Sequence, residues 1–251
     1  MPYKLLKSEL GQRIAQTSST NDWIKNPSIP YGAWVLSEEQ TSGKGRGNHV
    51  WLTLGDEPFI FSGKIQIPAH DLSLPLFSLF AARALLKTIF HFFPDRLEDT
   101  TIKWPNDIYR GDKKVSGILI ESEFVHGLYS IVIGIGLNFY GTNITKDLEQ
   151  IATFVSDRPL EEGRLEQFAF HLIEEMNASV IHLLDPGQIL KELVWIESYS
   201  YLKDQVVEAE LNGKMVRGRV LGFDEFGFLL IMTESGEKIE LMDSSPNFRI
   251  V

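Results

Sequence analysis

The sequence predicts an α+β fold, in which a mixed β-sheet with flanking helices is followed by a small C-terminal β-barrel. Two observations support this class. Apolar runs of strand length alternate with helical patterns over about residues 1–200, and short strands with tight turns follow from about residue 201. The chain has 251 residues, 43% of them hydrophobic, which is enough for one or two domains with a sizeable core. We therefore expect a catalytic-sized domain at 1–200 and a barrel at 201–251.

The N-terminal part predicts strands and one long helix. The polar cluster Thr17–Asn21 indicates a turn or a helix cap, and apolar runs predict strands at Ala33–Leu36 and Phe59–Ile67. Leu74–Phe93 predicts an amphipathic helix that faces the core and does not span a membrane. We expect its solvent-facing stripe to contain Arg83, Lys87 and His91, which are four residues apart.

The middle of the chain predicts a hairpin and two more helices. Thr101–Trp104 is a short strand that a proline ends, and Val115–Phe124 and Leu128–Phe139 form a hairpin. The second hairpin strand is nearly all apolar, so we expect it at the centre of the sheet, covered on both faces. Apolar residues at helical spacing predict helices at Leu165–Val180 and Gln188–Tyr199.

The C-terminal segment predicts four short strands. Asn212-Gly213 between two of them is a strong hairpin signal. A run of short strands with tight turns at the end of the chain is typical of a small β-barrel. The expected strands are Val206–Leu211, Met215–Phe223, Phe228–Met232 and Lys238–Leu241.

Composition excludes several classes of function. With 24 Lys and Arg against 34 Asp and Glu, the net charge is −10, which disfavours non-specific binding to nucleic acid or anionic membranes. The absence of cysteine excludes disulfides, thiolate metal sites, iron–sulfur clusters and a cysteine nucleophile. The N-terminal residues 1–7 lack the apolar stretch of a signal peptide. We expect a cytoplasmic protein.

The glycine loop, Thr41–Leu54, is the most informative segment. It contains Lys44 and Arg46 and no acidic residue, and glycine alternates at 43, 45 and 47. Glycines let the backbone approach a ligand, so this loop predicts an anion site, with phosphate as the obvious anion. The alternative is a flexible surface loop that is merely basic. It is not a Walker A loop, because the required Gly-x-x-x-x-Gly-Lys-[Ser/Thr] spacing is missing.

Three other segments contain candidate polar sites. Lys103–Asp107 places polar side chains around a Trp-Pro turn, which is also compatible with a purely structural turn. In Lys113–Gly117, strand alternation directs Lys114 and Ser116 to one face, and Val115 and Gly117 to the other. Lys114 then needs an anionic partner or a water-filled cleft, unless it is an edge lysine that reaches solvent. Ile133–Asn138 has two glycines in a strand, but it lacks the third glycine and helix of a dinucleotide fingerprint.

Together and in this order, these segments resemble the biotin protein ligases. The family pattern runs Ser-Thr-Asn, Gln-Thr-x-Gly-Arg/Lys-Gly-Arg, Lys-Trp-Pro-Asn-Asp, Lys-Lys-x-x-Gly-Ile-Leu-x-Glu and Ile-Gly-x-Gly-x-Asn. Five ordered motifs make the resemblance specific, and it covers about residues 10–200. The matching segments are Ser19–Asn21, Gln40–Arg46, Lys103–Asp107, Lys113–Glu121 and Ile133–Asn138.

The resemblance implies a fold and a two-step reaction. The fold is the class II synthetase-like biotin–lipoate ligase catalytic domain, with a C-terminal barrel of the Src-homology-3 type. Biotin and ATP, with Mg²⁺, give biotinyl-5′-AMP, and a lysine of a biotin carboxyl carrier domain then receives the biotin. The adenylate is the activated intermediate, so the enzyme needs cationic charge around the phosphate rather than a nucleophile.

The resemblance also assigns the site residues. It makes Lys114 and Arg46 catalytic, with Lys114 between the biotin carboxylate and the α-phosphate, and leaves Asp107 as a possible metal ligand. The residues implied to bind biotin are Ser19, Thr20, Asn21, Gln40, Lys44, Gly45, Arg46, Trp51, Lys114 and Gly117. Those implied to bind ATP or the adenylate are Lys44, Arg46, Lys103, Asn106, Asp107 and Asn138.

One departure from the family pattern concerns the glycine loop. His49 occupies the place of a second loop arginine found in bacterial members, so the loop is closer to the eukaryotic holocarboxylase synthetase version. Only 18 residues precede Ser19, so we expect no DNA-binding domain, and we expect a monomer or a homodimer. Two alternatives remain, a lipoate or octanoate ligase of the same fold and a non-catalytic biotin-binding regulatory module.

Overall fold

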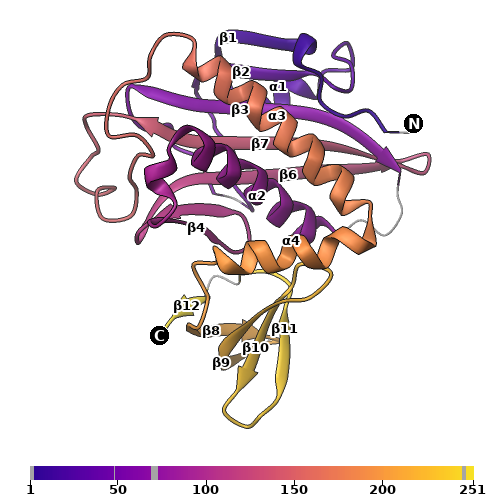
Figure 1. The fold of residues 1–251 in the computed structure, drawn as a ribbon, viewed down its shortest axis with the longest axis vertical. Helices are drawn as coiled ribbons and strands as arrows, with labels where there is room; N and C mark the ends of the chain where they lie inside the picture. Colours follow the sequence, from indigo (N-terminus) through magenta and orange to yellow (C-terminus); the bar gives the residue numbers. More distant parts are fainter. Residues whose placement is uncertain (1–2, 48, 69–72, 245–246) are drawn as a thin grey trace.

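The computed structural model describes residues 3–47, 49–68, 73–244 and 247–251. Asn48, which falls within the predicted glycine loop, and Met1 and Pro2 lie outside the described residues. The main layer is a seven-stranded sheet in the order β1-β2-β3-β7-β6-β5-β4 (Figure 1). Its strands are β1 (Gly11–Thr17), β2 (Trp34–Gln40), β3 (Glu57–Pro68), β4 (Thr100–Lys103), β5 (Asp107–Arg110), β6 (Lys113–Val125) and β7 (Leu128–Tyr140).

The sheet is mixed, as predicted. Strands β1 and β2 run parallel, and every other neighbouring pair is antiparallel. Strand β7 is the middle strand, which confirms the expectation that the most apolar run lies at the centre. Along it, Ile131, Ile133 and Ile135 belong to one hydrophobic cluster, whereas Val132 belongs to another. The side chains of β7 therefore alternate between two covered faces of the sheet.

Helices cover the two faces unequally. The long helices α2 (Leu74–Phe92) and α3 (Arg164–Leu183) pack on one face, with α4 (Pro186–Ser198) at its lower edge (Figure 1). The other face carries the short helix α1 (Thr20–Ile24), whose Ile24 packs with Val35 and Val132. Two 3₁₀ turns, at Ser8–Leu10 and Pro94–Arg96, complete the helical elements of the described residues. The face with only α1 is left partly open, and this is where a ligand can approach the sheet.

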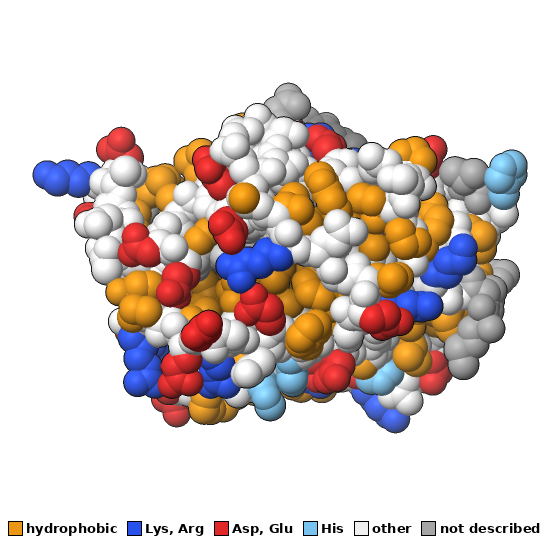
Figure 2. All heavy atoms as spheres, turned by 90° about the horizontal axis from the view of Figure 1, so that it is seen from above, with side chains coloured by type: hydrophobic (Ala, Val, Ile, Leu, Met, Phe, Trp, Pro, Cys, Tyr) orange, Lys and Arg blue, Asp and Glu red, His pale blue; other side chains and the backbone are white. Residues whose placement is uncertain are grey.

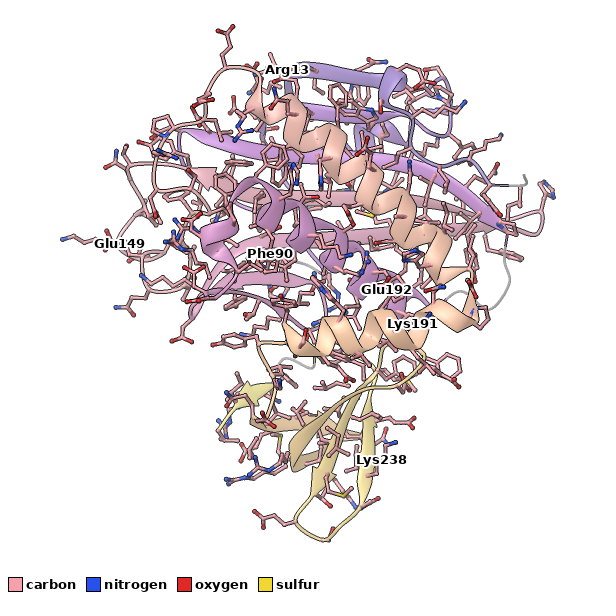
Figure 3. All side chains as sticks on the ribbon, in the orientation of Figure 1. Arg13, Phe90, Glu149, Lys191, Glu192 and Lys238 are labelled. Atoms are coloured by element: carbon pink, nitrogen blue, oxygen red, sulfur yellow. The ribbon has the colours of Figure 1, made fainter. Side chains whose placement is uncertain are left out.

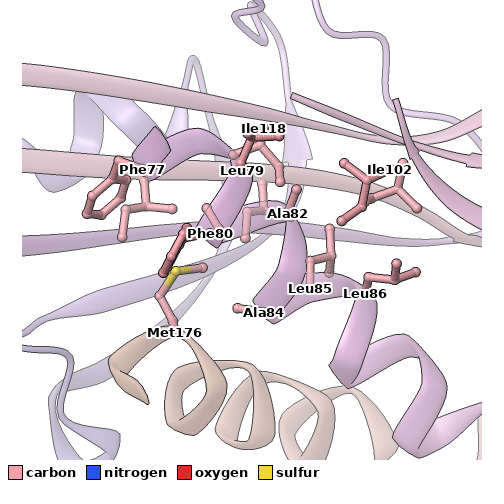
Figure 4. Packing of buried hydrophobic residues seen from close by; sticks show 14 of the residues in the cluster. Phe77, Leu79, Phe80, Ala82, Ala84, Leu85, Leu86, Ile102, Ile118 and Met176 are labelled. Carbon is pink, nitrogen blue, oxygen red and sulfur yellow. The ribbon is translucent and has the colours of Figure 1, made fainter. Parts of the chain in front are cut away.

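Helix α2 is more buried than predicted. Of the expected polar stripe, His91 is exposed and Lys87 half-buried, but Arg83 is buried. By length and composition α2 could cross a membrane, but 72% of its most apolar window is buried inside the protein, as for a core helix. Figure 4 shows its side chains packed between Met176 of α3 and Ile102 and Ile118 of the sheet. Arg83 is only 3% exposed, because α3 and α4 cover the side that the helical periodicity assigned to solvent.

A buried ionic cluster accommodates Arg83 at the meeting point of α2, α3 and α4. Its Nε pairs with Glu192 of α4, and its Nη1 donates a hydrogen bond to Ser179 Oγ of α3 at 3.1 Å. Glu192, labelled in Figure 3, is 2.7 Å from His182 Nδ1 through its second oxygen. A buried guanidinium needs such partners, since an unpaired charge is costly away from water.

The described structure contains three strands that the sequence did not predict. Strand β1 is an edge strand with exposed polar side chains, and β5 is a four-residue strand directly after the Trp-Pro turn. The third is β12 (Arg249–Ile250), which pairs with β8 (Val206–Leu211). Arg13 of β1, labelled in Figure 3, pairs with Glu38 and with Glu166 of α3. Acidic, basic and apolar side chains are interspersed over the face at this end of the molecule (Figure 2).

The C-terminal segment folds as a five-stranded antiparallel sheet in the order β11-β10-β9-β8-β12. This small sheet confirms the four predicted strands; a closed barrel is not established, because the order ends at β11 and β12. The sheet packs onto the first part of the chain, since Phe223 N–H donates to Glu197 Oε1 of α4 at 3.0 Å and Trp104 Nε1–H to Gly227 O at 3.1 Å. The other strands are β8 (Val206–Leu211), β9 (Lys214–Phe223), β10 (Leu229–Thr233) and β11 (Lys238–Leu241).

Candidate functional site

The open face of the seven-stranded sheet contains a cavity of about 320 Å³. Its walls come from α1, the glycine loop, strands β3, β6 and β7, the turn before β5, and Ser244 after β11. All the predicted site residues line it except Lys103 and Asn138. The predicted residues that the structure brings together are Ser19, Thr20, Asn21, Gln40, Lys44, Gly45, Arg46, Trp51, Asn106, Asp107, Lys114 and Gly117.

Glycines form the floor of this cavity. A Cβ atom at Gly134 would lie 2.3 Å from Asn21 Oδ1, and one at Gly136 would lie 2.2 Å from Trp51 Cε2. Both positions share the face of Val132, opposite α2 and α3. These two glycines were not among the predicted site residues, although a glycine within a strand signals the close approach of another group. Only bare backbone leaves room here for Asn21 and the indole.

One end of the cavity is a network of polar side chains that are hydrogen-bonded to one another and to the carboxylate of Glu121. The backbone N–H and the hydroxyl of Thr20 donate to Gln40 Oε1 at 2.7 and 2.9 Å. Ser62 Oγ lies 2.6 Å from Asn21 Oδ1 and 2.8 Å from Thr20 Oγ1, and Asn21 Nδ2 donates to Glu121 Oε2 at 2.7 Å. Thr20, Asn21 and Ser62 are each less than 5% exposed. The sequence analysis missed Ser62, a single polar residue within an apolar strand.

The other end of the cavity carries cations. Lys114 Nζ is 2.7 Å from Asp107 Oδ1 and 5.7 Å from the centre of the Trp51 indole. Arg46 pairs with Asp243, and its Nη1 is 3.4 Å from Asn106 Oδ1. These groups supply positive charge beside an aromatic wall, which suits an anionic ligand.

The second loop cation, Lys44, is paired outside the loop. Its Nζ is 2.6 Å from Asp22 Oδ1 on α1, and this hydrogen bond raises the pKa of Lys44. The loop folds back on itself, since Gly45 N–H donates to His49 O at 2.8 Å and Trp51 N–H to Gly43 O at 2.9 Å. The described part of the loop thus forms one wall of the cavity.

The direction of Lys114 differs from the prediction. In the register of β5 with β6, Tyr109 is opposite Lys114 and Ile108 is opposite Ser116. Val115 therefore has no partner on β5 and is the extra residue of a β-bulge. The bulge breaks the alternation and brings Lys114 to the same face as Gly117, whose Cβ would lie 3.3 Å from Lys114 Nζ. Ser116 instead donates to Gly136 O at 2.7 Å and lies outside the cavity lining.

Two predicted residues lie away from the cavity lining. Lys103 Nζ sits 4.3 Å and 5.2 Å from the ring centres of Tyr109 and Tyr201, and burial lowers the pKa of Lys103. Burial also disfavours the charged form of Tyr109 and so raises the pKa of its hydroxyl to about 12. Asn138 is 3% exposed, and its Nδ2 donates to Thr153 O at 3.3 Å. In this arrangement both side chains have structural partners.

The donor set fits a magnesium ion that arrives on a nucleotide. Among the described residues there is no cluster of three His, Asp or Glu side chains suited to a metal. Asp107 is the only carboxylate among the described lining residues. Mg²⁺ in nucleotide sites typically uses one or two protein carboxylates, substrate phosphates and water. Asp107 could therefore supply the single protein ligand of a magnesium–ATP substrate.

Comparisons with known proteins agree with this geometry. Residues 10–138 match the model of the biotin/lipoate A/B protein ligase family. A bifunctional ligase/repressor from Bacillus spizizenii is 30% identical over 238 residues, which cover 90% of this chain and 69% of the relative. A biotin–protein ligase from Schizosaccharomyces pombe is 31% identical over 256 residues, covering 90% of this chain and 38% of the relative.

Solved structures share the fold over nearly the whole chain. The biotin protein ligase from Aquifex aeolicus, solved in complex with biotin and ATP, superposes with a TM-score of 0.77 at 22% identity, covering 96% of this chain and 98% of that one. A ligase from Leishmania major, solved with biotinyl-5-AMP, gives a TM-score of 0.56 at 19% identity, with 92% and 98% coverage. This confirms the predicted architecture of a mixed sheet with flanking helices.

Proposed function

Because this chain belongs to the biotin/lipoate A/B protein ligase family, we propose that it makes biotinyl-5′-AMP from biotin and ATP and then transfers biotin to a lysine of a biotin carboxyl carrier domain. One observation carries this proposal. A single cavity has a polar network at one end and two cations, Lys114 and Arg46, at the other, as a ligand with a urea head and a carboxylate tail requires.

The polar end binds the ureido group of biotin in this proposal. Ser19, Thr20 and Asn21, which are buried, and Gln40, which is half-buried, supply the donors and acceptors. The glycine floor and the Trp51 indole enclose the apolar part of biotin. A lipoyl or octanoyl chain has no urea, so it offers these polar groups no hydrogen-bonding partner and gains no binding energy from them, which disfavours that alternative.

The cationic end binds the reacting groups. A carboxylate oxygen of biotin attacks the α-phosphorus of ATP, a new P–O bond forms, and pyrophosphate leaves with the electrons of the broken bond. Lys114 and Arg46 stabilise the negative charge that develops on the phosphoryl oxygens, aided by Lys44. Asn106 and Asp107 face the nucleotide, Asp107 as a ligand of the substrate's Mg²⁺. Lys103 and Asn138 support this end from behind the lining.

The second step needs no nucleophile from the enzyme. The amine of the carrier lysine attacks the acyl carbon of the adenylate, an amide bond forms, and AMP leaves. The acceptor class follows from relatives named as biotin–[acetyl-CoA-carboxylase] ligases in Paracoccus denitrificans and Mycobacterium tuberculosis. A non-catalytic binding module would have no need of phosphate-binding cations beside the biotin pocket, which counts against that alternative.

Several further properties complete the proposal. Residues 1–200 form the catalytic domain and residues 201–251 a small domain, whose antiparallel sheet is the counterpart of a Src-homology-3-type barrel. The protein acts in the cytoplasm as a monomer or a homodimer. It does not bind DNA, which is supported by the net charge of −10.

Acceptor labelling tests the whole function. The purified protein is incubated with MgATP, an unmodified biotin carboxyl carrier domain and either biotin, lipoate or octanoate, and the carrier is analysed by mass spectrometry. We expect one biotinylated lysine with biotin and no acylation with lipoate or octanoate. Acylation only with lipoate or octanoate would identify the other branch of the family, and no acylation with any acid would favour a binding module.

A further inference from the structure

Every Lys and Arg among the described lining residues of the cavity is paired with a carboxylate of this chain. The three carboxylates belong to different elements, namely the sheet, helix α1 and the C-terminal segment after β11. The ligand-binding charges are thus neutralised before any ligand arrives. The pairs are Lys114–Asp107, Lys44–Asp22 and Arg46–Asp243.

These three carboxylates differ in how exposed they are and in which other groups contact them. Asp107 begins β5, opposite Lys103 and Gly117 in the sheet register, and its side chain is 21% exposed. Asp22 is 44% exposed and has a second cation, Lys25, at 3.7 Å. Asp107 is thus the least exposed of the three carboxylates, and Asp22 has a second cation beside it.

Asp243 is the most exposed of the three carboxylates. Its side chain is 59% exposed, and its other contact is the backbone N–H of Ser244 at 2.6 Å. A carboxylate released from Arg46 at this position is readily hydrated, so breaking this pair costs least. Ser244 itself lines the cavity, which places the end of this segment at the cavity mouth.

We propose that Asp243 acts as an internal anion that holds Arg46 in the ligand-free protein and yields it to the phosphates of the nucleotide. Nucleotide binding and the contact between the glycine loop and the C-terminal segment then exclude each other. This inference rests on the proposed function only in taking the ligand to be a nucleoside triphosphate. In this proposal the C-terminal sheet contributes to the site, because the segment after β11 carries the carboxylate that competes with the nucleotide for Arg46.

The exchange is favourable on electrostatic grounds. An exposed ion pair contributes little to stability, because water screens the charges and two side chains lose freedom. A triphosphate carries several negative charges and binds a guanidinium through two parallel hydrogen bonds, which are stronger than one contact to an exposed carboxylate. Arg46 therefore favours the phosphate, while Asp243 lowers the apparent affinity by competing for it.

Removing the competing charge tests this inference. Asp243→Asn is compared with Glu240→Gln, a matched control on β11 that removes the same charge from an exposed residue of the same sheet. Calorimetry measures the binding of ATP and of inorganic tripolyphosphate to both variants and to the parent chain, without biotin. We expect Asp243→Asn to bind both ligands about two- to fivefold more tightly, the factor by which an exposed ion pair competes, and Glu240→Gln to match the parent.

Hydrogen exchange gives a second readout. ATP should increase exchange in residues 238–244 of the parent chain, and Asp243→Asn should show this increase without ATP. Weaker binding by Asp243→Asn would mean that Asp243 positions Arg46, and unchanged binding would mean that Asp243 does not compete with the ligand. Either result overturns the inference. It is also overturned if the parent chain binds neither ATP nor tripolyphosphate. Tripolyphosphate binding requires no biotin chemistry, so the two proposals can fail separately. If Asp243→Asn binds tripolyphosphate more tightly but the parent protein biotinylates no carrier, the proposed function is contradicted and this inference is not.

Discussion

Replacing Gly134 by alanine tests whether biotin binding depends on a bare cavity floor. The added Cβ would lie 2.3 Å from Asn21 Oδ1, whereas ordinary contact begins at 3.4 Å, so Asn21 must move by about 1.1 Å. That shift breaks its contacts with Ser62 at 2.6 Å and Glu121 at 2.7 Å. The polar end of the cavity would thereby lose its geometry.

The size of the effect follows from the displaced Asn21. A buried polar group of biotin left without its partner costs about 1–3 kcal/mol of binding free energy. Since about 1.4 kcal/mol changes an equilibrium constant tenfold, we expect biotin to bind Gly134→Ala about 5- to 100-fold more weakly.

Calorimetry with biotin measures this change, and thermal unfolding shows whether the variant is folded. Gly187→Ala on α4 is the matched control, because its Cβ meets only Asp185 Oδ1, at 3.2 Å, and lies outside the cavity lining. We expect the control to bind biotin as the parent does. A folded Gly134→Ala protein with parental affinity would refute the assignment of Asn21 to the biotin site.

Three further predictions concern catalysis and stability. Lys114→Ala should lower the rate of adenylation about 10²- to 10³-fold, as for loss of one preorganised charge donor, and a parental rate would remove Lys114 from that role. Glu192→Ala leaves Arg83, 3% exposed, without its main carboxylate; urea unfolding should show a loss of about 3–5 kcal/mol, and a loss within measurement error would contradict the buried-charge argument. Burial, with the stacked His91, lowers the pKa of His171 from 6.5, so the unfolded chain binds the proton more readily. Stability from this group is therefore present above about pH 6.5 and lost as pH falls through the lowered pKa. His171→Phe should flatten the melting temperature against pH in that range, and an unchanged slope would contradict the assignment.

The elements that sequence periodicity predicted best are those with a strong apolar pattern. The central strand β7 and helix α2 lie within a residue or two of the expected bounds. Strand β1 was missed because an edge strand with one polar face has no apolar run, and β5 because it has four residues. Periodicity also misplaced Arg83, since a helical pattern identifies a polar face but not the helices that cover it.

The candidate site was predictable mainly through ordered motifs. Segments far apart in sequence, from Ser19 to Gly117, meet in one cavity, and no local pattern specifies that meeting. The direction of Lys114 depends on a β-bulge, which alternation cannot reveal. Ser62 and Asp243 are single polar residues whose importance comes from their partners in space. Their roles therefore required the three-dimensional structure.

Ligand-dependent exchange of radiolabelled pyrophosphate into ATP tests the central claim most directly, because it reports reversible adenylate formation without any carrier. With purified protein and Mg²⁺, we predict exchange that requires biotin and is lost in Lys114→Ala. Exchange that occurs only with lipoate or octanoate, or that is absent with every acid, would contradict the assignment of this cavity to biotinyl-AMP formation.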